Sequence, residues 1–195
     1  MIHVVAQNEP PDFDERVRQP GLAALDREDN PLPDYWRRCL DDLYRLYNGI
    51  CAYVCIYIPR VTGGRTVEHF APKTKNREDA YEWRNYRLVC NVMNSRKRDF
   101  EDVLDPFEIL DGWFHLQLTT MKIVPNPNLP TDIQNRIKDT INRLKMNQAD
   151  CIEARSCYYD EYIAHDDPLT FRLLKKWCPF VAMELERQGL RRNGD

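Results

Sequence analysis

Proline placement constrains the N-terminal part of this 195-residue chain before any other feature. Five of its thirteen prolines lie within the first 33 residues, at Pro10, Pro11, Pro20, Pro31 and Pro33. Proline lacks the backbone N–H that a helix interior needs, and its ring clashes with the preceding turn. The sequence therefore predicts an extended N-terminal arm over residues 1–33.

A helix and then a strand are predicted directly after the arm. The stretch "PDYWRRCLDDLYRLYNG" repeats apolar residues at helical spacing behind Asp34, a typical N-cap, and it ends well at Asn48-Gly49. The run "ICAYVCIYI" is rich in β-branched and aromatic residues, so it predicts a strand over residues 50–58.

A second strand and a helix are predicted beyond the next turn. Gly63-Gly64 is a turn signal, and "RTVEHF" predicts a short strand over residues 65–70. Residues 77–100 are polar and helical in propensity, and their pattern is compatible with a break near Asn85. Together these segments predict a small strand–turn–strand–helix unit.

The C-terminal part, residues 105–195, has a different pattern. The stretch "DGWFHLQLTTMKIVPNP" alternates like a hairpin over residues 111–127. Residues 130–147 then form an apolar stripe at helical spacing, and further helices are predicted over 149–164 and 168–189. The chain is thus expected to have an α+β fold, in which residues 34–104 form the central unit between helical flanks.

Composition excludes several classes of protein. A hydrophobic content of 43% supports a genuine core, and no apolar run approaches the ~18 residues of a transmembrane helix. The N-terminal stretch has no basic segment followed by an apolar one, so no secretory signal is expected. Seven cysteines without export should be thiols or metal ligands, which favours a cytoplasmic protein.

The charge is distributed unevenly along the chain. The net charge is −3, yet residues 60–98 contain ten Lys and Arg against four Asp and Glu. Such a basic segment fits a nucleic-acid partner, although a solvated basic face would look the same in the sequence.

The stretch "VEHFAPK" lies inside this basic segment and places Glu68 beside His69 at the predicted end of a strand. A neutral imidazole can accept a proton from water, and a carboxylate is the ligand that a hard cation such as Mg²⁺ prefers. Taken alone, the pair is more often a surface feature than a catalytic one.

Three stretches together resemble an HNH endonuclease of the ββα-metal type: "YNGICAY", "VEHFAPK" and "EWRNYRLVCNVMNSRKRDF". The resemblance covers residues 47–100. It implies a small ββα-metal (HNH) finger embedded in a mainly helical domain. The longer context, including "DPFEILDGWF", also resembles the HNH subunits of Septu-type anti-phage systems, the PtuB-like proteins.

The resemblance implies a role for each residue of the motif. Glu68 and Asn94 would bind a single Mg²⁺ or Mn²⁺, and His69 would be the general base that activates water. Asn85 would hold the His69 loop in shape through its side chain. The residues that would contact nucleic-acid phosphates are Lys73, Arg96 and Lys97. In isolation, each asparagine is more often a helix cap or a solvated residue.

The cysteines depart from the pattern of the family, many of whose members hold a structural zinc with two Cys-x-x-Cys pairs. Cys51 and Cys90 match one position of each pair, but Val54 and Met93 stand where the second cysteines would be. Valine is no zinc ligand and methionine a poor one. Cys51 and Cys90 are therefore expected to be a degenerate zinc site that holds no structural zinc.

Three functional interpretations remain open. The resemblance implies a metal-dependent endonuclease that acts on DNA, tRNA or another RNA, as the nuclease subunit of an anti-phage complex with an ABC-type or SMC-like (PtuA-like) ATPase. Alternatively, the finger is catalytically inactive and binds nucleic acid or a partner protein. The third interpretation is an α+β domain whose match to the motif is accidental.

Overall fold

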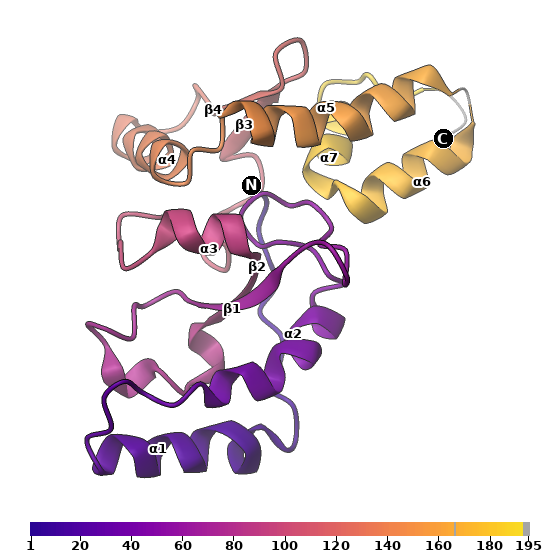
Figure 1. Ribbon diagram of the computed structural model, residues 1–195. Helices are drawn as coiled ribbons and strands as arrows, with labels where there is room; N and C mark the ends of the chain where they lie inside the picture. Colours follow the sequence, from indigo (N-terminus) through magenta and orange to yellow (C-terminus); the bar gives the residue numbers. More distant parts are fainter. Residues whose placement is uncertain (166, 193–195) are drawn as a thin grey trace. The chain divides into compact units, whose positions relative to one another are not determined.

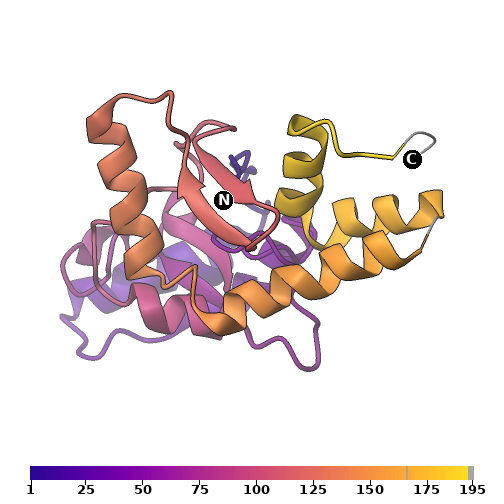
Figure 2. The ribbon, with the colours of Figure 1, turned by 90° about the horizontal axis from the view of Figure 1, so that it is seen from above.

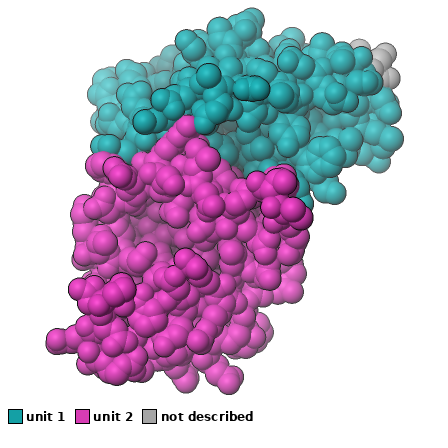
Figure 3. Space-filling view, in the orientation of Figure 1, with its two compact units in different colours: residues 1–4, 53–57, 102–195 teal, residues 5–52, 58–101 magenta. Residues whose placement is uncertain are grey.

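The computed structural model describes residues 1–165 and 167–192. The chain divides into two compact units, drawn in different colours in Figure 3. Unit 1 comprises residues 1–4, 53–57 and 102–195, and unit 2 comprises residues 5–52 and 58–101. Helices alternate with two small antiparallel sheets, so the prediction of an α+β fold is confirmed.

The division of the chain into units differs from the predicted domain boundaries at the N-terminus. Most of the predicted arm belongs to unit 2, together with the central segment that carries the motif. None of the described helices is long and apolar enough to cross a membrane.

The prediction of an extended arm is wrong for residues 14–26. A π-helical turn over Asp14–Arg18 leads into α1 (Gln19–Asp26). Only Pro20 lies inside this segment, where it is the second residue of α1, directly after the π-helical turn. The other prolines flank the helix, so they bound it rather than break it.

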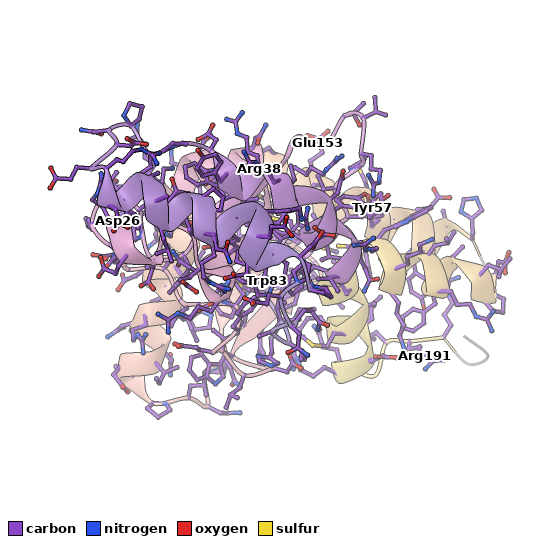
Figure 4. The ribbon with its side chains drawn as sticks, turned by 90° about the horizontal axis from the view of Figure 1, so that it is seen from below. Asp26, Arg38, Tyr57, Trp83, Glu153 and Arg191 are labelled. Carbon is purple, nitrogen blue, oxygen red and sulfur yellow. The ribbon has the colours of Figure 1, made fainter. Side chains whose placement is uncertain are left out.

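Aromatic packing fixes the arm within unit 2. The ring of Phe13 lies edge-on to Trp83 and Tyr86, with centroid separations of 5.5 and 5.9 Å. The indole N–H of Trp83, labelled in Figure 4, donates a 2.7 Å hydrogen bond to the carbonyl of Gln7. The arm therefore helps to build the core of unit 2.

Gly21 marks the closest approach of α1 to this core. A Cβ atom at this position would lie 2.1 Å from the ring of Tyr81, which is inside van der Waals contact. Tyr81 is buried and donates its hydroxyl to the carbonyl of Pro33. A side chain at position 21 therefore requires the ring or the helix to move.

We expect Gly21→Ala to lower the free energy of unfolding by about 1–3 kcal/mol, because overpacking outweighs the gain in helix propensity. Leu22→Ala is the matched control on the same helix. Leu22 is 45% exposed, and its replacement should change the stability by less than about 0.5 kcal/mol. Urea denaturation of both variants measures the difference. Equal stabilities would contradict the close contact.

The predicted helix after Asp34 is confirmed. It begins as a 3-10 turn over Tyr35–Cys39 and continues as α2 (Leu40–Leu46). Its end is closed by the backbone N–H of Gly49, which donates to the carbonyl of Tyr44 at 2.8 Å. Gly49 has a φ of 69°, the left-handed conformation that glycine adopts readily at helix ends.

The strand predicted over residues 50–58 is wrong. This segment forms turns with only isolated bridges at its ends, and Cys55 has a φ of 55°, outside the extended region. Cys51 to Cys55 are all buried. The apolar and β-branched pattern of this segment therefore reflects its burial in the core, and the segment does not pair in a sheet.

The predicted strand over residues 65–70 is confirmed as β1 (Arg65–His69). It pairs antiparallel with β2 (Tyr86–Cys90), with His69 opposite Tyr86 at one end of the ladder. Figure 1 shows the two strands side by side within unit 2, with α3 next to them. The sheet therefore joins the stretch "VEHFAPK" to the segment that follows it in the motif.

A continuous helix over residues 77–100 is wrong. Two 3-10 turns, Arg77–Asp79 and Trp83–Asn85, precede β2, and α3 (Asn91–Lys97) follows it directly. Residues 77–90 contain no α-helix, so the predicted helix is limited to α3. The run "YRLVC" pairs as a strand because β1 offers a partner far away in the sequence.

The predicted hairpin over residues 111–127 is confirmed in unit 1. β3 (Phe114–Gln117) and β4 (Lys122–Pro125) pair antiparallel. The predicted helix that follows is α4 (Thr131–Arg143), which packs against β4 and buries Ile137. Figure 2 shows α4 beside the hairpin.

Three more helices complete unit 1. α5 (Ala149–Ala164) matches its prediction. The single helix predicted over 168–189 is instead two, α6 (Pro168–Trp177) and α7 (Pro179–Arg187). Pro179 disfavours helical geometry at the preceding residue, so the chain turns there and starts a new helix.

Candidate functional site

A pocket of about 360 Å³ lies at the end of β1 in unit 2. Glu68 and His69 line it from β1, and Asn94 lines it from α3. The remaining lining residues are Val67, Pro72, Lys73, Thr74, Ser95, Arg98 and Asp99. The two ends of the proposed motif, about 25 residues apart in the sequence, therefore meet at one cavity.

His69 is held in a fixed orientation. Its Nε2 lies 2.9 Å from the carbonyl oxygen of Ala80, and its ring packs edge-to-face on Trp36 and Tyr86 at centroid separations of 4.7 and 5.2 Å. A carbonyl oxygen only accepts hydrogen bonds, so Nε2 carries the proton in the neutral ring. The lone pair is then on Nδ1.

Burial lowers the pKa of His69 to about 4, because desolvation disfavours the imidazolium. The nearby ammonium of Lys73 acts in the same direction. The side chain is therefore neutral throughout the physiological range. A neutral ring can accept a proton at any of these pH values, but its basicity is modest.

The low pKa of His69 predicts a dependence of stability on pH. The pKa of His69 is near 6.5 in the unfolded chain and about 4 in the folded protein. Between these two pH values the unfolded state binds more protons, so the free energy of unfolding falls as the pH is lowered. The loss between pH 7 and pH 5 should be about 2 kcal/mol.

Urea denaturation of wild type and His69→Gln at these two pH values isolates this contribution, because other groups titrate in both proteins. We expect the stability of wild type to fall further than that of His69→Gln. Parallel losses in the two proteins would show that His69 titrates normally.

Asn85 holds the loop that follows His69. Its side-chain oxygen accepts a hydrogen bond from the N–H of Ala71 at 2.7 Å, and its amide nitrogen donates to the carbonyls of Ala71 and Asp79 at 3.0 Å each. Its own carbonyl accepts from the N–H of Phe70. Asn85 is buried, so these bonds fit the loop-holding role that the motif implies.

Glu68 and Lys97 form a buried ion pair beneath the pocket. The Lys97 ammonium lies 2.9 Å from the Glu68 carboxylate, and both side chains are only 1% exposed. The ammonium also donates to the carbonyls of His69 and Phe70. This corrects the expectation that Lys97 reaches a substrate phosphate, because α3 turns this side chain toward β1 instead.

The basic groups that line the pocket are Lys73 and Arg98. The Lys73 ammonium lies over the Trp36 ring, 4.7 Å from its centroid, in a cation–π contact. Arg96 is half-buried on α3 and is not one of the lining residues. Sequence reasoning missed Trp36 and Arg98, since no local pattern links either residue to His69.

Cys51 and Cys90 come together in unit 2, as the comparison with zinc-binding fingers suggested. Their sulfur atoms are 4.0 Å apart. Val54 and Met93, which stand at the other two positions, are buried. Val54 belongs to unit 1 and Met93 to unit 2, so the two residues are buried in different compact units.

The donor set at the pocket fits a hard divalent cation. Within residues 1–165 and 167–192 there is no group of three or more His, Cys, Asp and Glu side chains that could hold a metal. However, Mg²⁺ keeps several waters and needs only one or two protein oxygens. The Glu68 carboxylate and the Asn94 amide carry such oxygens at one cavity, and the carboxylate is also ion-paired with Lys97.

The fold and the site define a mixed helix-and-strand protein with an imidazole, two carboxylates, an amide and two basic side chains at one pocket. No model of a protein family matches the sequence, and no curated protein matches it either. The function is therefore argued from the geometry and the residue pattern.

Proposed function

We propose that this chain is a divalent-metal-dependent endonuclease of the HNH type, in which β1, β2 and α3 form the ββα-metal finger. The observation that carries the proposal is the joint placement of Glu68, His69 and Asn94 at one pocket, with Asn85 bonded to the loop between them. This joint placement supports the proposal over an accidental match to the motif.

In the proposed reaction His69 takes a proton from water at Nδ1. The bond from Nε2 to the Ala80 carbonyl holds the ring in the required tautomer, and Asn85 fixes the backbone that follows. Lys73 and Arg98 attract the phosphodiester to the pocket. A cation held by Glu68 and Asn94 would polarise the scissile phosphate and stabilise the leaving oxygen.

The resemblance to PtuB-like proteins supports a place for this nuclease in an anti-phage complex in the cytoplasm. The partner would be an ABC-type or SMC-like ATPase. Unit 1 contains the helices α4 to α7, and these helices would form the docking surface for that partner.

The test is cleavage of plasmid DNA and total tRNA by the purified chain, with Mg²⁺ or Mn²⁺ and then with EDTA. We expect cleavage of one substrate that requires the metal and stops in EDTA. If the chain alone is inactive, the ATPase is added. Cleavage that persists in EDTA would contradict the proposal.

A second candidate function is an inactive finger that binds nucleic acid or a protein. The observation that favours it is the closure of the site, because Glu68 is ion-paired to Lys97 and His69 is only 8% exposed. Binding of tRNA or plasmid DNA without cleavage, with the ATPase present, would support this function over the first.

A further inference from the structure

A pair of thiols lies at the N-terminal end of α3, outside the candidate pocket. The Cys51 thiol donates toward the Cys90 sulfur at 4.0 Å, and the N–H of Cys90 lies 3.5 Å from the Cys51 sulfur. Cys51 is buried, whereas Cys90 is partly exposed. The two residues are 39 positions apart in the sequence, so their contact depends on the fold of unit 2.

We propose that Cys51 and Cys90 are a site of reversible oxidation, at which a hydroperoxide converts the two thiols into a disulfide. The inference rests on the placement of the two sulfur atoms and the unequal exposure of the two residues. It does not depend on nuclease activity, and it assigns the pair a chemistry other than zinc binding.

Cys90 is the thiol poised to react first. Its pKa is lowered to about 6, because the Cys51 thiol and the backbone N–H groups of Val92 and Met93 stabilise the thiolate. Burial instead raises the pKa of Cys39 and of Cys178 to about 12, which keeps both as thiols. Cys90 thus differs from these buried cysteines in the direction in which its pKa is shifted.

The reaction takes two steps. The Cys90 thiolate attacks the peroxide, the O–O bond breaks, and sulfenic acid and hydroxide form. The Cys51 thiol then loses its proton to the hydroxide and attacks the Cys90 sulfur, which releases a second hydroxide that leaves as water with the remaining proton. Two electrons pass from the pair to the peroxide, and hydrogen peroxide with two thiols gives one disulfide and two waters.

The required movement is small. A disulfide has a sulfur–sulfur distance of about 2.05 Å, so the sulfurs must approach by about 2 Å from their present contact. Cys51 follows the turn that ends α2, and Cys90 ends β2 directly before α3. The bond would tie residues 51 and 90 at the base of the helix that carries Asn94.

Peptide mapping after treatment with hydrogen peroxide tests the proposal. The protein is oxidised with a small excess of peroxide, alkylated with iodoacetamide and digested with trypsin and chymotrypsin, which cleaves after Tyr53 and so separates Cys51 from Cys55. We expect a linked pair of peptides containing Cys51 and Cys90, lighter than their sum by about 2 Da, the mass of two hydrogens. Dithiothreitol should reverse the link.

One variant tests for the sulfenic acid intermediate, and a second is its control. In Cys51→Ser the Cys90 sulfenic acid has no resolving thiol, so dimedone should trap it. Cys157→Ser is the matched control, because Cys157 is exposed in unit 1 and lies outside the pair. Its replacement should leave the link intact.

Three outcomes would overturn the proposal. The first is equal alkylation of Cys51 and Cys90 before and after peroxide. The second is conversion of Cys90 in wild type to sulfinic acid while Cys51 stays a thiol. The third is a bound zinc, found by metal analysis, that protects both thiols from oxidation.

Discussion

Replacing His69 by alanine is expected to lower the rate of metal-dependent cleavage by about 10²–10⁴-fold, the usual contribution of a general base. The neutral ring carries its lone pair on Nδ1, and no other imidazole lines the pocket. Cleavage of the preferred substrate under single-turnover conditions measures the loss. Thr74→Ala, at an exposed lining residue, is the matched control and should change the rate little.

The pH dependence of this rate tests whether His69 is buried and neutral in the active protein. Because burial lowers its pKa to about 4, the rate of wild type should not fall between pH 8 and pH 6, where an ordinary histidine would begin to protonate. A rate that halves near pH 6.5 would contradict the fixed, buried ring. Circular dichroism of His69→Ala checks that a lost rate is not lost folding.

Replacing Lys97 by methionine is expected to lower the free energy of unfolding by about 3–5 kcal/mol. The variant keeps a side chain of similar length but removes the ammonium that contacts the Glu68 carboxylate and the carbonyls of His69 and Phe70. Breaking a buried pair by removing one partner is strongly destabilising, because a buried charge loses its neutralising contact. Urea denaturation measures the change.

A double variant distinguishes the ion pair from simple packing. Glu68→Gln combined with Lys97→Met removes both charges, so much of the lost stability should return relative to Lys97→Met alone. Lys75→Met is the matched control, since the Lys75–Glu101 pair is about half exposed. Its loss should change the stability by less than about 1 kcal/mol. If the stability losses of the two substitutions simply add in the double variant, Glu68 and Lys97 are not energetically coupled.

Local periodicity predicted those elements whose pattern is set by their own sequence. The helix after Asp34, the hairpin over 111–127 and the helix over 149–164 each carry apolar residues at the right spacing and clear end signals. The elements that were predicted wrongly depend on contacts with residues far away in the sequence. Residues 50–58 are apolar because they are buried, and "YRLVC" becomes a strand because β1 pairs with it.

The candidate site was predictable as a set of residues but not as an arrangement. The order of Glu68, His69, Asn85 and Asn94 in the sequence predicts one shared site. The structure brings three of them to one pocket, and Asn85 is bonded to the loop after His69. The run Arg96-Lys97-Arg98 could not be resolved from sequence. Which of three adjacent cations turns inward depends on how α3 packs against β1.

Binding of Mn²⁺ tests the central claim most directly, because it needs neither the substrate nor the ATPase. We expect titration followed by electron paramagnetic resonance to show a single Mn²⁺ per chain. Asn94→Ala and Glu68→Gln should weaken its binding by at least about tenfold, and His69→Ala should leave it nearly unchanged. Equal affinity in wild type, Asn94→Ala and Glu68→Gln, or no binding by wild type, would contradict the account.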